Sequence, residues 1–126
     1  MTVRNLEFLF HPKSIAVVAD PDEPSRYAEV VRRNLAAGGF SGQIMSINAK
    51  KRSLFGIGAH VHIDKIEVAP DLAIICPALA DVPQIIAQLG ARGTRAVIVG
   101  PSLRDRLSSS EAVEVRKAIL DAARPH

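Results

Sequence analysis

The stretch that decides the fold is Ile15-Ala16-Val17-Val18-Ala19, an apolar run bounded by Ser14 and Asp20. Two similar runs follow, Leu72-Ala73-Ile74-Ile75-Cys76 and Ala96-Val97-Ile98-Val99. Short apolar runs rich in β-branched residues, bounded by turn formers, are typical of strands buried on both faces. We therefore predict that the three runs form adjacent, central strands of a parallel sheet.

Weaker strand patterns and helical patterns fill the chain between these runs. The weaker strands are Gln43–Ile47 and a short one near Ala59–Val61. A short lead-in helix is expected within residues 3–10. Strands that alternate with helices pair in parallel through crossover connections. The pattern predicts an α/β fold with a Rossmann-like, doubly wound, mostly parallel sheet and helices on both faces.

Three helices are expected between and after the strands. The first extends from Ser25 to Gly38, where Gly38-Gly39 is a strong stop signal. The second extends from Asp81 to about Leu89, and the third begins near Ser108, with Val115 and Ile119 on its buried face. The apolar stripe of the first helix consists of Tyr27, Val30, Val31 and Leu35.

Composition restricts the class of protein. A chain of 126 residues with 48% hydrophobic residues fits one globular domain over residues 1–126, either alone or within a longer multidomain protein. The net charge of +3 and the 4% aromatic content do not favour a nucleic-acid partner, and no apolar run is long enough to cross a membrane. A single Cys excludes an internal disulfide, so we expect a reducing, cytoplasmic location.

Candidate binding residues follow the strands, because ligands of such sheets lie at the carboxyl ends of the strands. The segment after the first strand contains Asp20, Pro21 and Ser25 but no Gly, and it carries three carboxylates. A dinucleotide site would place glycines there, where the backbone approaches a pyrophosphate. The segment is either a phosphate-binding turn at a helix N-terminus or a solvated acidic cap.

The segment after the second strand is basic, because Asn48 is followed by Lys50, Lys51 and Arg52. NAD-binding proteins carry a carboxylate in this region, which takes the ribose hydroxyls. Three cations instead suit a ligand with a phosphate on or near its ribose. The alternative is a solvated basic turn.

The remaining two segments begin with small residues. Pro77 and Ala78 after the run Leu72–Cys76 could form a flat floor for an adenine or a pantetheine arm, and Gly100 after the run Ala96–Val99 allows close backbone approach. Cys76 has no His near it in sequence, so we expect a buried, slowly reacting thiol. His60 and His62 would share one strand face, but without a third ligand we predict no metal site. No catalytic constellation can be identified.

Taken in order, several motifs resemble the CoA-binding domain of NDP-forming acyl-CoA synthetases. They begin with the segment from Leu9 to Val18 and continue with Gly38-Gly39-Phe40-Ser41-Gly42-Gln43-Ile44 and Ile47-Asn48-Ala49-Lys50. Asp71 to Ala78, Val82-Pro83, Gly90, Gly93 and Ala96 to Val99 complete the pattern, which covers roughly residues 6 to 104. Related proteins include the α subunit of succinyl-CoA synthetase and protein lysine acetyltransferases fused to a synthetase-like part.

The resemblance implies a nucleotide-binding domain that holds CoA or acyl-CoA. Phosphate contacts would fall at Pro21 to Ser25 and at Lys50 or Lys51, and the residues Pro77-Ala78 and Gly100-Pro101 would lie under the nucleotide or the pantetheine. It also implies a partner domain or subunit with ATP-grasp or acetyltransferase activity, so that the chain is the CoA-binding part of a ligase or fused acyltransferase and is not catalytic alone.

Two departures from the family pattern keep alternatives open. The family's Gly-Ala-Ser after the first strand is Ala19-Asp20-Pro21 here, and a later Gly is missing near Arg26-Tyr27-Ala28. A regulatory or protein-interaction module that kept the fold and lost the ligand is therefore the second hypothesis. A dehydrogenase fragment is the third, and the absent glycines and the basic second segment disfavour it.

Overall fold

The computed structural model describes residues 4–19, 26–48, 60–75, 82–100 and 109–126. Its five strands form one parallel sheet in the order β3-β2-β1-β4-β5. The strands are β1 (Ser14–Ala19), β2 (Gln43–Asn48), β3 (His60–His62), β4 (Leu72–Ile75) and β5 (Ala96–Val99). This is the predicted doubly wound, Rossmann-like architecture.

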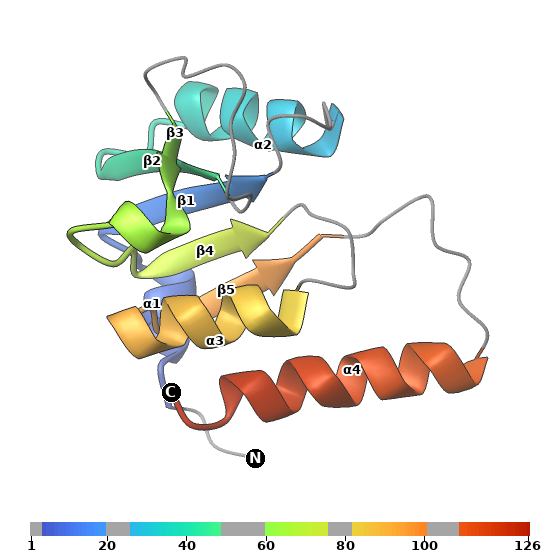
Figure 1. Cartoon of the computed structure of the whole chain (residues 1–126). Helices are drawn as coiled ribbons and strands as arrows, with labels where there is room; N and C mark the ends of the chain where they lie inside the picture. Colours follow the sequence, from blue (N-terminus) through green and yellow to red (C-terminus); the bar gives the residue numbers. More distant parts are fainter. Residues whose placement is uncertain (1–3, 20–25, 49–59, 76–81, 101–108) are drawn as a thin grey trace.

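Helices lie on both faces of the sheet (Figure 1). They are α1 (Leu6–Phe10), α2 (Arg26–Ala37), α3 (Val82–Arg92) and α4 (Ser109–Ala123), with a 3-10 turn, η1 (Ile63–Lys65), after β3. None of the helices in the described part of the chain has the length and apolar character needed to span a membrane. The helix α2 ends where the sequence predicts, because Gly39 adopts a positive φ of 75° directly after Gly38 caps the last turn.

Each face of the sheet has its own core. On the face covered by α3 and α4, Ala16 and Val18 of β1 pack with Ile75 of β4 and with the buried stripe of α3. That stripe consists of Val82, Ile85, Ile86 and Leu89. On the face covered by α1 and α2, Ile15 and Val17 of β1 lie beneath Leu9 of α1 and beneath Val31 and Leu35 of α2. Alternate side chains of β1 therefore enter two different cores, which explains its continuous apolar run.

The prediction that all three apolar runs form central strands is wrong for β5. This strand pairs with β4, as expected, but it is the outer strand of the described sheet. Val97 and Val99 pack against the core on the α3 and α4 face, whereas Ile98 on the other face remains 40% exposed. One covered face is enough to select apolar residues, so an apolar run does not distinguish an outer strand from a central one.

The predicted stripe of α2 is also partly wrong. Val31 and Leu35 pack against the sheet, but Val30 is exposed and Tyr27 lies at the border of the buried face. The side chain that enters the core at the start of the helix is that of Ala28. The spacing Ala28, Val31, Leu35 describes the buried face better than the stripe predicted from the larger side chains.

Hydrogen bonds at the amino ends of the strands hold the sheet together. Asp71 is central to them: its Oδ2 accepts from the Lys13 N–H at 2.9 Å, and its own N–H donates to Ser14 Oγ at 3.0 Å. Its carbonyl accepts from the N–H groups of Arg95 and Ala96. Asp71 therefore joins the starts of β1, β4 and β5.

Candidate functional site

The carboxyl ends of four strands lie at one edge of the sheet. The parallel register places Ala19 at the end of β1 beside Asn48 at the end of β2. It also aligns Val18 of β1 with Ile75 of β4, and Ile75 with Val99 of β5. The chain therefore leaves β1, β2, β4 and β5 at the same edge, which is where the sequence predicts binding residues.

This edge contains the topological switch point of the sheet. From β1 the chain continues into α2 on one face, whereas from β4 it continues into α3 on the opposite face (Figure 1). The two strands are neighbours, so the connections diverge between them. In open parallel sheets, ligands bind in the crevice outside the strands at such a point.

Two of the predicted binding residues belong to the described part of the structure. Asn48 is the last residue of β2, and Gly100 directly follows β5. The other seven lie outside the described residues: Asp20, Pro21, Ser25, Lys50, Lys51, Pro77 and Ala78. Cys76 also lies outside them, so its predicted burial remains a prediction.

Gly100 lies at this edge and is buried. Its N–H donates to the carbonyl of Ile75 at 2.9 Å, which extends the pairing of β4 and β5 by one bond. A Cβ added at Gly100 would lie 2.6 Å from Cε1 of the Tyr27 ring. The group that packs closely against the Gly100 backbone is thus an aromatic side chain of α2, and the approach of a ligand to Gly100 remains a prediction.

Tyr27 therefore lies next to a candidate site residue, a position that sequence reasoning missed because the helical pattern assigned it to the buried stripe. A better signal was available in the small residue next to it. Ala28 is buried over the end of β1, against Val17 and Ala19, and this fixes the start of α2 there. Tyr27, next to that anchor, packs against Gly100 at the carboxyl edge and is 36% exposed.

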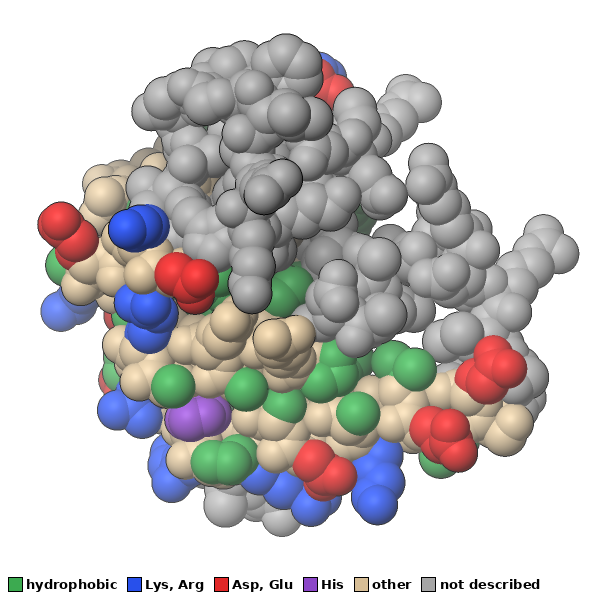
Figure 2. Space-filling model, viewed as in Figure 1, with side chains coloured by type: hydrophobic (Ala, Val, Ile, Leu, Met, Phe, Trp, Pro, Cys, Tyr) green, Lys and Arg blue, Asp and Glu red, His purple; other side chains and the backbone are tan. Residues whose placement is uncertain are grey.

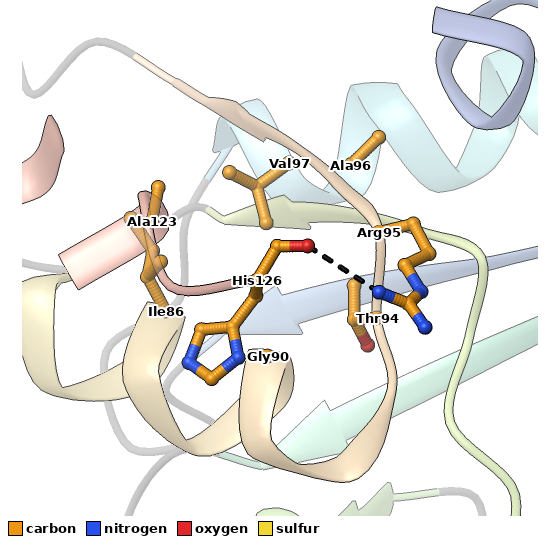
Figure 3. A pocket seen from close by; sticks show the side chains of 8 residues that line it. All are labelled: Ile86, Gly90, Thr94, Arg95, Ala96, Val97, Ala123 and His126. Carbon is orange, nitrogen blue, oxygen red and sulfur yellow. Dashed lines mark hydrogen bonds between the residues drawn. The ribbon is translucent and has the colours of Figure 1, made fainter. Parts of the chain in front are cut away.

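Two hollows in the described structure are lined by other residues than the predicted binding residues. One of about 40 Å³ lies between α3, β5 and the last turn of the chain, where the His126 ring stacks over Gly90 (Figure 3). The His126 carbonyl accepts from Arg95 Nη1 at 3.3 Å and from Asn5 Nδ2 at 3.4 Å. A groove of about 340 Å³ runs along β2, between Met45 and the segment after η1. Neither contains a predicted binding residue.

The described residues show mixed charge and no metal-binding cluster. Figure 2 shows hydrophobic side chains along α3 and the adjoining side of α4, with acidic and basic side chains both present around them. Among the residues that the structure describes, no three His, Cys, Asp or Glu side chains are grouped to hold a metal ion. His60 and His62 form the two ends of β3, as the sequence suggested.

Comparison with known proteins gives one family match. The family model described as CoA binding domain matches residues 13–126, which is most of the chain. The match includes the strands β1, β2, β4 and β5 and the four segments that follow them.

Similar proteins are larger than this chain. The α subunit of ADP-forming acetate–CoA ligase I from Pyrococcus furiosus is 28% identical over 97% of this chain and 27% of its own length. ADP-forming acetate–CoA ligase II from Archaeoglobus fulgidus is 27% identical over 99% of this chain and 18% of its own length. The chain therefore spans about a quarter or less of these relatives.

A solved structure shows the same fold. The apo form of the dinucleotide forming acetyl-coenzyme A synthetase 1 of Candidatus Korarchaeum cryptofilum superposes with a TM-score of 0.66 at 26% identity. The similarity covers 94% of this chain and 26% of that one. The architecture is thus shared with one part of a larger synthetase.

Proposed function

Because this chain belongs to the CoA binding domain family, we propose that it binds CoA or an acyl-CoA at the carboxyl edge of its sheet. The observation that carries the proposal is the parallel pairing of the strands. It brings the ends of β1, β2, β4 and β5 to one edge, where the four segments with predicted contact residues begin. The binding site is therefore assembled from parts of the sequence that lie far apart.

The proposed pose follows the order of the strands across the sheet. The basic segment after Asn48, with Lys50 and Lys51, takes the 3′-phosphate of the ribose beside β2. The pyrophosphate lies near the start of α2, beside the segment with Asp20, Pro21 and Ser25. The rest of the ligand extends over Pro77 and Ala78 toward Gly100.

We propose that the chain supplies binding and that a partner domain or subunit supplies the chemistry. The relatives named as acetate–CoA ligases are about four times as long as this chain or longer, so most of their length has no counterpart in it. The residues of the proposed site are suited to hold phosphates and an apolar arm, and they do not form a nucleophile with a general base. An ATP-grasp or acetyltransferase unit is the proposed partner.

One feature favours a second candidate function, an interaction module without ligand. The segment after β1 carries Asp20, Asp22 and Glu23 and lacks glycine. These carboxylates repel a pyrophosphate unless they point into water, where screening reduces the repulsion. We therefore expect weak CoA binding, with a dissociation constant above roughly 10 μM.

Calorimetric titration with CoA, dephospho-CoA and NAD tests the proposal. We expect CoA to bind more tightly than dephospho-CoA, because charge-assisted hydrogen bonds contribute about 1.5–3 kcal/mol each. We also expect the double variant Lys50→Ala/Lys51→Ala to remove that preference. Lys13→Ala is the matched control, since Lys13 is a cation at the opposite, amino edge of the sheet.

Two outcomes would contradict parts of the proposal. Equal affinities for CoA and dephospho-CoA would show that the basic segment does not bind the 3′-phosphate. No detectable binding of CoA at millimolar concentration would reject the binding function and favour the interaction module.

A further inference from the structure

The ring of Tyr27 reaches from one side of the switch point to the other. Burial of Ala28 against Val17 and Ala19 fixes the start of α2 over the end of β1. From this position, the Tyr27 side chain extends past the end of β4 to Gly100, which follows β5. An aromatic side chain thus lies at the switch point, where ligands of such sheets bind.

One side of the Tyr27 ring packs against Gly100, and the residue is still accessible for contact with a ligand. Gly100 is buried, and its N–H is already used by the carbonyl of Ile75. The backbone under the ring therefore has no free donor to offer a phosphate. Tyr27 itself is 36% exposed, so part of the residue remains accessible to solvent. Such a surface suits an uncharged, partly aliphatic group rather than an anion.

We infer that Tyr27 holds the pantetheine arm of bound CoA and sets the preference for the complete cofactor over its nucleotide part. This inference rests on the proposed function. Neighbouring strands are about 4.8 Å apart, so the end of β5 is roughly 14 Å from the end of β2. With the ribose phosphate beside β2 and the pyrophosphate beside β1, the part of CoA that reaches Gly100 is the arm of methylene and amide groups.

A comparison of two ligands separates the contribution of the pantetheine arm to affinity from that of the nucleotide. Adenosine 3′,5′-bisphosphate keeps the base and the ribose phosphates of CoA but lacks the outer phosphate of the pyrophosphate and the arm. For Tyr27→Ala, we expect the dissociation constant of CoA to rise about 3–10-fold, which is about 0.6–1.4 kcal/mol and the size of an aromatic contact. The affinity for the bisphosphate should change less than about two-fold, within the usual scatter of such energies.

Two further variants distinguish a direct effect of the Tyr27 ring on CoA affinity from an effect on folding. Tyr27→Phe keeps the ring and should retain CoA affinity. Gly100→Ala leaves Tyr27 in the sequence but adds a Cβ 2.6 Å from its ring, so the ring must move and CoA should weaken selectively. Val113→Ala, at an exposed apolar position of α4, is the control. Circular dichroism and thermal unfolding establish that each variant is folded.

The possible results separate this inference from the proposed function. If the unsubstituted protein binds neither ligand, the proposed function fails and the inference fails with it. If the protein binds both ligands and Tyr27→Ala weakens both equally, the inference alone is wrong. Tighter CoA binding by Tyr27→Ala would also overturn it, because the ring would then obstruct the arm.

Discussion

Two buried side-chain polar atoms in the described part of the structure lack a hydrogen-bond partner, Arg32 Nε and Thr94 Oγ1. Thr94 is the simpler case, since the whole residue is only 4% exposed. Its N–H donates to the Leu89 carbonyl at 3.0 Å, so the backbone N–H has a partner and the hydroxyl does not. A buried polar group without a partner costs about 1–3 kcal/mol.

Thr94→Val should therefore stabilise the protein. Valine has nearly the same shape and removes the unpaired hydroxyl, so we expect the free energy of unfolding to rise by about 1 kcal/mol. Thr94→Ser, the matched control, keeps the hydroxyl and loses a methyl group, so its free energy of unfolding should fall by about 0.8 kcal/mol. Urea denaturation measures both. A destabilised Val variant would mean that the hydroxyl is hydrogen-bonded in solution.

Burial differs sharply between neighbouring strands at the same level of the sheet. Ile74 of β4 and Ile98 of β5 are partners in the parallel register and lie on the same face. Ile74 is 8% exposed, whereas Ile98 is 40% exposed. The difference arises because β4 has a strand on each side and β5 is the outer strand of the described sheet.

The two isoleucines thus provide a matched pair of variants. Ile74→Ala should lower the free energy of unfolding by about 2–5 kcal/mol, the usual cost of a large-to-small change in a core. Ile98→Ala should cost less than about 1.5 kcal/mol, because less apolar area is removed from the core. Guanidinium denaturation of both variants measures the difference. Equal losses would place β5 inside a fully covered sheet.

The fold could be predicted from the sequence because its signal is local. The runs containing Val17, Ile74 and Val97 are apolar on both alternating sets of positions, which is the pattern of a parallel sheet. The place of β5 in the sheet could not be predicted, because the pattern of one strand does not show which neighbours cover it. The same limit applies to Tyr27, whose role depends on Gly100, a residue far away in the sequence.

Across the whole molecule, the hydrogen bonds centred on Asp71 and the proposed binding site lie at opposite edges of the sheet. At the amino edge, Asp71 accepts from Lys13 and donates to Ser14, joining β4 to the start of β1. At the carboxyl edge lie Tyr27, Gly100 and the ends of the strands. A variant at the amino edge should therefore affect folding without affecting the ligand.

Asp71→Ala tests this separation. Loss of the hydrogen bond from Lys13 should lower the free energy of unfolding by about 0.5–1.5 kcal/mol. The dissociation constant of CoA, measured well below the unfolding temperature, should stay within about two-fold of the original value. Glu114→Ala, which removes a carboxylate from an exposed position of α4, is the control for the change in charge. A parallel loss of CoA affinity and stability would show that the edges are coupled.

The position of β1 also determines the order in which strands can pair while the chain is being synthesised. One side of β1 pairs with β2, which follows after a single helix, but the other side pairs with β4, which is synthesised much later. In the interval, one side of the strand has open backbone donors and acceptors. Ala16, Val17 and Val18 of this strand are fully buried in the finished fold. A nascent or truncated chain that ends before β4 thus presents an apolar strand edge of the kind that pairs with other chains.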